Sequence, residues 1–468
     1  MTHDTSDHPA DAADAQTARR AARIVFFTLF LDIIGFSIIF PLFPSLLDHY
    51  LHAPDVSPVL ASLLSAIHAF QSRVGMDDAS TVVLFGGVLG AIYSMLQFFF
   101  APVFGGLSDR YGRRPVLIAC IAGTVLSHLM WVCAGSFELF ALSRVLGGVM
   151  SGSITTASAA IADVTPERGR SRGMALIGIA FGLGMTLGPL LGISAAFDIT
   201  QVRPEWTAWG VNPFSAPAAL AAALALANLA FLWFRFPETL PPGAQPAAAS
   251  ARTANPLRLF QRHPSPGVTA TVMANFAFTA ALAGVEFSLT FLAADRFGFG
   301  PARNGAMLAF VGVCLALVQG GYVRRMAARV GSARMARRGL LILAPALVLI
   351  GFAPAPWALY AGLLLFAIGS AQTMPCLMGL VSVYAPPDEQ GQVLGVFRSL
   401  GALARAVGPL TGCTLYWIWG PEMTYLAGAA VLAVPLWLIR RLPSETDAAT
   451  DPPPQRLPRP PQSTTIGG

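Results

Sequence analysis

Long apolar runs constrain this chain more than any other feature of its sequence. A helix needs about 20 residues to cross the hydrocarbon core of a bilayer. Backbone polar groups in lipid must be satisfied within the segment, so each run is expected to be a helix. We count twelve such runs: 24–47, 81–107, 115–135, 137–162, 173–197, 214–236, 267–293, 304–323, 339–354, 356–385, 392–418 and 423–439. The sequence therefore predicts an all-α membrane protein with twelve transmembrane helices.

The composition indicates a surface that faces lipid. Only 12% of the 468 residues are charged and 54% are hydrophobic, whereas soluble domains carry about 25% charged residues. All 30 basic residues are arginine, and most stand between the runs, so the net positive charge does not indicate nucleic-acid binding. The five cysteines stand singly in apolar runs, without metal-ligand spacing. We expect no metal, no cofactor and no nucleic-acid partner.

The placement of arginine predicts the orientation, because basic residues accumulate on the cytoplasmic side of a membrane. With a cytoplasmic amino terminus, the arginines that fall on the outer side are only Arg73, Arg203, Arg296 and Arg303. Both termini are therefore expected in the cytoplasm. Residues 1–23 would form a polar tail, and residues 440–468 a disordered one. We expect a multi-pass protein of the inner (plasma) membrane.

The chain also repeats itself. The sequence Gly-Pro-Leu-Leu-Gly at 188–192, in the fifth run, recurs as Gly-Pro-Leu-Thr-Gly at 408–412, in the eleventh. Two six-helix halves related by a parallel repeat are an architecture of transporters that rock about a central site. We expect halves over 24–236 and 267–439, joined by a cytoplasmic linker over 237–266.

The connection between the first two runs contains a further periodic segment. Apolar residues recur there at helical spacing, namely Val59, Leu60, Leu63, Leu64, Ile67, Phe70 and Val74. The other face carries Ser62, Ser65, His68 and Gln71. This pattern predicts a short amphipathic helix on the outer membrane surface or over the outer mouth of the bundle.

A glycine- and arginine-rich loop joins the second and third runs. It reads Gly105-Gly106-Leu107-Ser108-Asp109-Arg110-Tyr111-Gly112-Arg113-Arg114. The glycines allow a tight turn, and Asp109 can pair with arginine or with the positive amino end of a helix. The pattern resembles the signature loop of the major facilitator superfamily, which latches the two halves at the cytoplasmic face. The resemblance implies a gate formed by Gly105, Asp109, Arg110, Gly112, Arg113 and Arg114.

Two further runs resemble motifs of the same family. Arg144 is followed by Gly147 and Gly148 in the fourth run, and a guanidinium inside a span needs a partner or a wet cavity. Its spacing resembles the family's fourth-helix motif, whose arginine is tied to proton movement. The fifth run places small residues four apart, which lets helices approach closely. Its residues Gly184, Gly188, Pro189 and Gly192 resemble the antiporter motif of proton-coupled drug exporters, although Ile193 replaces a frequent second glycine.

Other segments resemble the tetracycline-efflux-like branch of that superfamily. They are the first run around Asp32, the segment 161–167, Glu286 in the seventh run and the stretch 398–409 in the eleventh. Asp32 and Glu286 are the only carboxylates well inside the runs. With Arg144 and Arg405 they are the predicted proton-coupling and cavity residues. His128 is also intramembrane, and a structural role for it is favoured over a proton-carrying one.

The leading prediction is a secondary active transporter that exports a small amphipathic or hydrophobic compound in exchange for protons. No nucleotide-binding loop and no nucleophile–base pair is recognisable, so an enzyme is not expected. The alternatives are a transporter or importer of an endogenous metabolite and, in another class, a non-transporting receptor or scaffold. The predicted partners are a small-molecule substrate, protons and the lipid bilayer, and the protein is expected to be a monomer.

Overall fold

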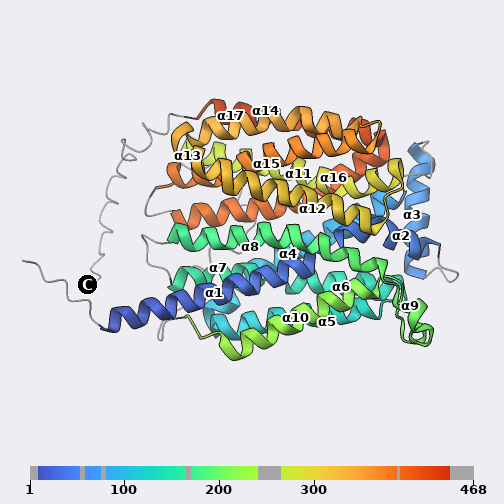
Figure 1. Cartoon of the computed structure of the whole chain (residues 1–468), viewed down its shortest axis with the longest axis horizontal. Coiled ribbons are helices and arrows are strands. Elements are labelled where there is room, and N and C mark those ends of the chain that lie inside the picture. Colours follow the sequence, from blue (N-terminus) through green and yellow to red (C-terminus); the bar gives the residue numbers. More distant parts are fainter. Residues whose placement is uncertain are drawn as a thin grey trace, which may run out of the picture.

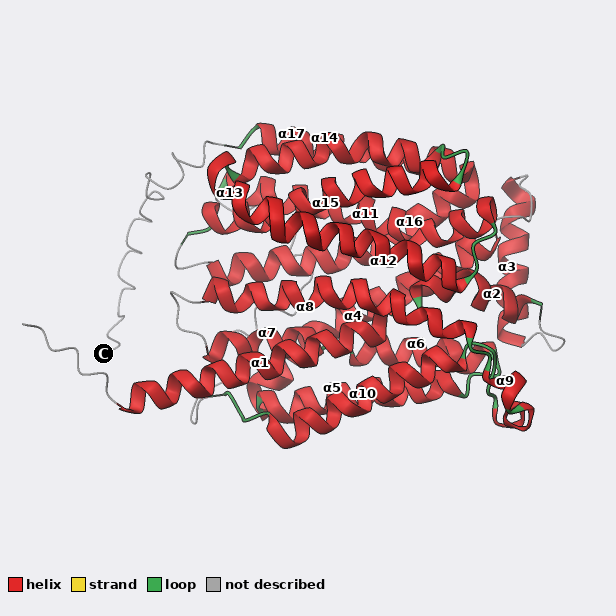
Figure 2. Cartoon of the chain, in the orientation of Figure 1, coloured by secondary structure: helices red, strands yellow, loops and turns green. Residues whose placement is uncertain are grey.

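The structure is a computed structural model that describes residues 9–52, 58–74, 81–164, 170–240, 265–386 and 390–442. Within these ranges every regular element is a helix (Figure 2). Ten segments of the described chain are long and apolar enough to cross a membrane. The protein is therefore an all-helical membrane protein, as the apolar runs predict.

The first part of the chain forms one bundle, drawn from blue to green in Figure 1. Its longer helices are α1 (Pro9–Ser37), α2 (Phe43–Leu51), α3 (Pro58–Val74), α4 (Thr81–Tyr111), α5 (Arg113–Val132), α6 (Phe137–Met150), α7 (Ser153–Val164), α8 (Arg170–Leu191) and α10 (Ser215–Arg235). Short turns complete it: η1 (Phe40–Leu42), η4 (Gly192–Ala196), α9 (Ile199–Val202) and η5 (Pro204–Trp209).

The second part forms the other bundle, drawn from yellow to red. Its elements are α11 (Pro266–Phe297), α12 (Pro301–Leu317), the π-helical segment η8 (Val318–Val323), α13 (Arg324–Val330), α14 (Ser332–Gly351), α15 (Pro356–Tyr384), α16 (Gln390–Val431) and α17 (Ala433–Arg440). The two bundles lie side by side with their long helices running in roughly the same direction (Figure 1).

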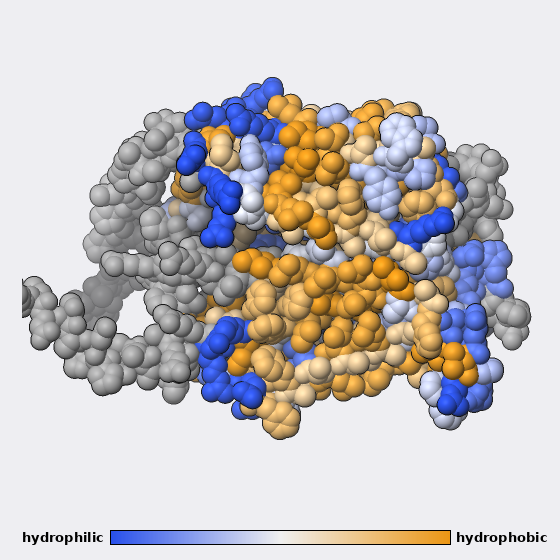
Figure 3. Space-filling model, in the orientation of Figure 1, coloured by the Kyte–Doolittle hydropathy of each residue, from blue (hydrophilic) through white to orange (hydrophobic). Residues whose placement is uncertain are grey.

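The ends of the assembly differ. The start of α1 and the end of α17 lie at one end, here called the termini end, and α3 and α9 lie at the other, the α3 end (Figure 1). Hydrophilic residues gather at both ends, and a hydrophobic band separates them on the face shown in Figure 3. The predicted helix within the first connection is confirmed as α3, which lies across its end of the bundle.

Several helices depart from the predicted runs. Helix α1 starts at Pro9, inside the predicted polar tail, because an alanine-rich sequence continues the helix outward. The fourth run is divided between α6 and α7 by a turn at residues 151–152, where Ser151 Oγ donates to the carbonyl of Gly148 at 2.7 Å. The last two runs appear as α16 and α17: α16 contains the eleventh run and the start of the twelfth, and Gly420, with a φ of 78°, and Pro421 lie between them inside it. A left-handed glycine followed by proline interrupts the helix there.

The two bundles meet through glycines near the α3 end. A Cβ atom added at Gly87 of α4 would lie 2.4 Å from Cys413 Cβ of α16, and one at Gly90 would lie 2.6 Å from the Phe287 ring of α11. On the other side, a Cβ at Gly305 of α12 would lie 2.7 Å from the carbonyl oxygen of Pro189 in α8. These positions have no space for a side chain, so the halves are in tight contact at the α3 end.

Candidate functional site

Among the described residues, the hydrogen bonds and ion pairs of the loop between α4 and α5 are made within the first half. The buried Arg113 places Nη1 2.5 Å from Asp109 Oδ1, and its Nε donates to Asp163 Oδ2 at 2.8 Å. The same Nη1 donates to Ser108 Oγ at 2.7 Å. A buried guanidinium needs this many acceptors to offset the loss of water. Asp109 is thus paired inside the loop, so any contact with the second half requires it to rearrange.

The turn itself depends on Gly112 and on a carboxylate that follows α10. Gly112 has a φ of 102°, and a Cβ added there would lie 2.5 Å from Glu238 Oε2. Glu238 accepts the backbone N–H of Arg113 at 2.9 Å and that of Arg114 at 3.1 Å. A carboxylate at the first N–H groups of a helix satisfies unpaired donors and the helix dipole. Glu238 therefore caps α5 and fixes the end of α10 to it.

These hydrogen bonds change the acidity of Glu238. Burial alone would raise the pKa of its carboxyl group, but backbone N–H donors of Leu240, Arg113, Arg114 and Thr239 together outweigh it. The pKa of Glu238 is accordingly lowered below its ordinary value. Hydrogen bonds to the ionised form favour that form.

The glycine motif of α8 faces α1, within the same half. Ser37 Oγ donates to the carbonyl of Gly184 at 3.0 Å, and a Cβ at Gly188 would lie 1.9 Å from the same Ser37 oxygen. A Cβ at Gly192 would lie 2.6 Å from the Pro41 ring. The motif therefore brings α8 close to α1, and contact with the second half comes instead from Thr186, the Pro189 carbonyl and Ile193, which meet α12.

Asp32 lies on α1 beside the break between α6 and α7. Its Oδ2 accepts a hydrogen bond from Ser153 Oγ at 2.6 Å. Ser153 is the first residue of α7 and is buried. No arginine is in ion-pair contact with Asp32 among the described residues, so the carboxylate and Arg144, two of the predicted charges, do not meet in this structure.

Arg144 lies inside the first half among aromatic rings. Its guanidinium carbon is 4.8 Å from the centre of the Trp131 ring and 5.7 Å from that of Phe140. Nε donates to Ser143 Oγ at 3.2 Å, and Nη2 finds no hydrogen-bond partner in the described part of the chain. Both ring nitrogens of the nearby His128 are also buried without one. Arg144 is thus a buried cation with no carboxylate partner among the described residues.

The second half contains two of the predicted charged residues, Glu286 and Arg405. Glu286 lies in the middle of α11 and its side chain is exposed, and Arg405 lies on α16 of the same half. The two do not form an ion pair in this structure. Arg405 instead places its guanidinium 5.7 Å from the ring centre of Phe181, which belongs to α8 of the first half. Arg405 therefore stands where the two halves meet.

The predicted set omits three residues that the structure brings to the site. Asp163 shares Arg113 with Asp109, and Ser153 holds Asp32. Arg398 Nη1 donates to Ser158 Oγ at 3.3 Å, which joins α16 to α7 across the two halves. Charge alone could have pointed to Asp163, because it ends a run on the same side as the loop. Ser153 carries no such signal.

Among the described residues, no cluster of His, Cys, Asp and Glu is arranged to hold a metal ion.

Comparison with known proteins decides the family. The profile of the Major Facilitator Superfamily matches residues 25–409 and 323–462. The chain belongs to the major facilitator superfamily. It is 35% identical over 450 residues to the human Major facilitator superfamily domain-containing protein 10, covering 92% of this chain and 94% of that protein. It is 28% identical to the class C tetracycline resistance protein of Escherichia coli, over 91% of this chain and 97% of that one.

Solved structures agree with this membership. The crystal structure of the human organic anion transporter MFSD10 superposes with a TM-score of 0.72 at 34% identity, covering 90% of this chain and 99% of that one. A bacterial homologue of the human lysosomal transporter Spinster, in an inward-facing conformation, shares the fold with a TM-score of 0.63 at 13% identity, over 90% and 95% of the two chains. This superfamily member is a multi-pass membrane transporter and not an enzyme.

Proposed function

We propose that this superfamily member is a proton-coupled exporter of small amphipathic organic compounds, drugs included, in the plasma membrane. Antiport and efflux are properties suggested by its tetracycline-resistance relatives, which are more distant than MFSD10. The observation that carries the proposal is the placement of one carboxylate within a long apolar helix of each half, Asp32 in α1 and Glu286 in α11, with neither in an ion pair with a described residue.

The proposed topology has twelve spans. Ten segments meet the criteria of length and hydropathy, and one of them, Val393–Arg440, contains the break at Gly420 that divides it into two. Helix α14 supplies the remaining span: it is 20 residues long and lies in the bundle, although Arg334, Arg337 and Arg338 lower its hydropathy. The halves 24–236 and 267–439 are the proposed moving units, and 237–266 is the linker.

The proposed orientation places the termini end in the cytoplasm. That end carries the arginines of the α4–α5 loop and those of α13 and α14. Such an excess of arginine is typical of cytoplasmic segments. With this orientation the tight contact at the α3 end closes the outer side, and the loop of Asp109 and Arg113 lies at the inner gate.

In the proposed coupling mechanism, a proton competes with an arginine or with the solute for the same carboxylate. Burial favours the protonated form of an isolated carboxyl group, and a neighbouring arginine favours the ionised form. When Arg405 or a solute approaches Glu286, the carboxylate is stabilised and a proton leaves. In this structure the arginine lies against Phe181 and forms no ion pair with Glu286, and we propose that this is the state in which the carboxylate takes up its proton. Asp32 is the second candidate, with Ser153 as its only hydrogen-bond donor among the described residues.

The proposed substrate class includes organic anions. Arg144 and Arg405 both lie against aromatic rings without a paired carboxylate in the described structure. A cation beside an aromatic surface suits a flat apolar molecule that carries a negative charge. The relative MFSD10 is an organic anion transporter, and the two proteins align over nearly their whole lengths.

The test uses purified protein in proteoliposomes with an imposed pH gradient of each sign. The probes are a panel of amphipathic anions, cations and neutral compounds of similar size. Export by proton exchange predicts that solute accumulates in vesicles that are acidic inside. Accumulation in vesicles that are acidic outside would instead show an importer of symport type. No flux of any compound under either gradient would support a receptor or scaffold.

A further inference from the structure

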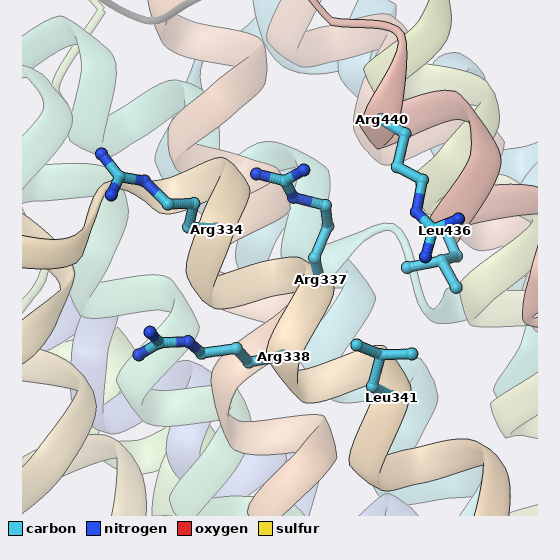
Figure 4. A pocket seen from close by; sticks show the side chains of 6 residues that line it. All are labelled: Arg334, Arg337, Arg338, Leu341, Leu436 and Arg440. Carbon is cyan, nitrogen blue, oxygen red and sulfur yellow. The ribbon is translucent and has the colours of Figure 1, made fainter.

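A cluster of arginines at the termini end stands apart from the proposed transport path. A depression of about 240 Å³ lies between α14 and α17 and is lined by Arg334, Arg337, Arg338, Leu341, Leu436 and Arg440. Figure 4 shows three of the arginines on α14, Arg440 on the neighbouring α17, and the two leucines between these helices. Both helices lie at the edge of the bundle farthest from the first half (Figure 1).

These four arginines have no anionic partner among the residues that the structure describes. None of them forms a hydrogen bond or ion pair with a described residue. Elsewhere at the termini end, Arg113 is paired with Asp109 and Asp163, and Arg114 donates to the carbonyl of Trp233. Four like charges in one depression repel each other, so an anion from outside the protein would stabilise them.

The position of three of these arginines on α14 adds to their unfavourable electrostatic energy and so to the stabilisation that an anion would give. The helix begins at Ser332, so Arg334, Arg337 and Arg338 occupy its first two turns. The amino end of a helix carries a partial positive charge, and cations there are unfavourable. The arginines therefore do not stabilise the helix on which they stand. Spacing of three and four residues places them on one face, where their charges add.

The apolar residues in the depression and the residues next to it on α17 indicate what kind of anion fits. Leu341 is 55% exposed and follows Arg337 and Arg338 by one turn along α14, toward the hydrophobic band. Trp437, on the turn of α17 that leads to Arg440, is 50% exposed, and Arg441 lies 3.9 Å from its ring centre. Exposed tryptophan beside arginine is typical of the membrane–water interface. The depression therefore has arginines toward the termini end and leucines toward the hydrophobic band, and it lies at the level expected of lipid headgroups.

We propose that this depression binds the headgroup of an anionic phospholipid of the cytoplasmic leaflet. The phosphate contacts Arg337, Arg338 and Arg440, and the acyl chains lie over Leu341 and Leu436. Basic pockets between membrane helices on the cytoplasmic side are suited to such headgroups. A free phosphate would use the same arginines but would gain nothing from the exposed leucines.

The test measures lipid binding without transport. Full-length protein in a neutral detergent is titrated with phosphatidylglycerol, with phosphatidylcholine of the same acyl chains, and with inorganic phosphate, and bound lipid is counted by native mass spectrometry. The variant Arg337→Gln/Arg338→Gln/Arg440→Gln is compared with Arg324→Gln/Arg325→Gln/Arg329→Gln, which removes equal charge from exposed positions of α13. The single Arg440→Gln variant is included in case the triple variant does not fold.

The native protein is expected to retain phosphatidylglycerol in preference to phosphatidylcholine. The pocket variant is expected to bind it at least about tenfold more weakly, because each arginine near an anionic surface adds to the attraction. Arg440→Gln gives a smaller loss, and the α13 variant binds as the native protein does. Unchanged binding by folded pocket variants would overturn the proposal. So would an equal loss in the α13 variant, or inorganic phosphate that displaces the lipid at equal phosphate concentration.

Discussion

At the scale of single residues, Arg113 holds the α4–α5 loop together through contacts with residues of the first half. Its side chain contacts Asp109, Asp163 and Ser108, and its backbone N–H donates to Glu238. The sequence pattern placed Asp109 and Arg113 in one loop and left an arginine or the amino end of a helix as the partner of Asp109. It could not identify Asp163 or Glu238, because their proximity depends on where α7 and α10 end in space rather than on spacing along the chain.

Replacement of Asp109 by asparagine tests the gate role of the loop. The change leaves Arg113 with Asp163 but removes one of its two ion pairs. We expect the transport rate to fall about tenfold, which corresponds to about 1.4 kcal/mol in the barrier. The affinity for substrate should stay nearly constant, because the loop is at the membrane surface. Rate and affinity are measured by initial flux and by equilibrium binding. A tenfold change in affinity with an unchanged rate would contradict the role.

Glu238 gives a prediction for pH. Its pKa is lowered in the folded protein, so its contribution to stability is present above its ordinary value of 4.5 and is lost as pH falls through the folded pKa. The thermal unfolding temperature is therefore expected to fall on acidification below about pH 4.5. Glu238→Gln should lower that temperature at neutral pH and reduce its dependence on acid. An identical acid profile in the variant would show that this carboxylate does not stabilise the α4–α5 turn.

At the scale of elements, α8 shows what a glycine pattern does and does not specify. Glycines four apart predicted a close helix contact, and the structure has one. The partner was not predictable, because the spacing fixes a face of the helix and not what lies against it. The glycines contact α1, whereas the second half is touched by Thr186 and Pro189 of α8 and by Ile193 of the following turn η4.

This geometry sets the expected effect of Gly188→Leu. The side chain would collide with Ser37 and the Ile34 carbonyl of α1, so the first half should pack poorly. Overpacking of this kind costs about 1–3 kcal/mol or more, and we expect a lower thermal unfolding temperature before any effect on closure between the halves. The matched control is Gly182→Leu on the same helix, since a Cβ at Gly182 meets nothing within 4 Å. Equal unfolding temperatures for the two variants would contradict the close packing of Gly188 against α1.

At the scale of the whole molecule, the apolar runs predicted most of the helices because the length needed to cross lipid is a strong physical constraint. The turn between α6 and α7 and the early start of α1 were not visible in hydropathy, since both lie within sequences that read as continuous. The pairing of charges was the least predictable part. Asp32, Arg144 and Glu286 all lie inside predicted spans, yet each has different neighbours in the structure: Ser153 for Asp32, aromatic rings for Arg144 and no ion-pair partner for Glu286 among the described residues.

The contact between the halves at the α3 end can be tested with a native cysteine. Cys413 is fully buried against Gly87, and Gly90 contacts the Phe287 ring. Gly90→Leu should hold the halves apart there and increase the labelling of Cys413 by a membrane-impermeant thiol reagent. The experiment uses a Cys133→Ser background, because Cys133 is exposed. Gly395→Leu, where a Cβ meets nothing within 4 Å, serves as the control. Unchanged labelling in Gly90→Leu would mean that this contact does not close the molecule.

Solute accumulation driven by a pH gradient, in proteoliposomes that contain Asp32→Asn or Glu286→Gln, tests the central claim most directly. Each variant keeps the size of the side chain and removes its exchangeable proton. If these carboxylates couple protons to transport, at least one variant should still exchange solute across the membrane at equal pH but no longer concentrate it against a gradient. If both variants concentrate solute under a pH gradient as well as the native protein does, neither carboxylate is the proton site.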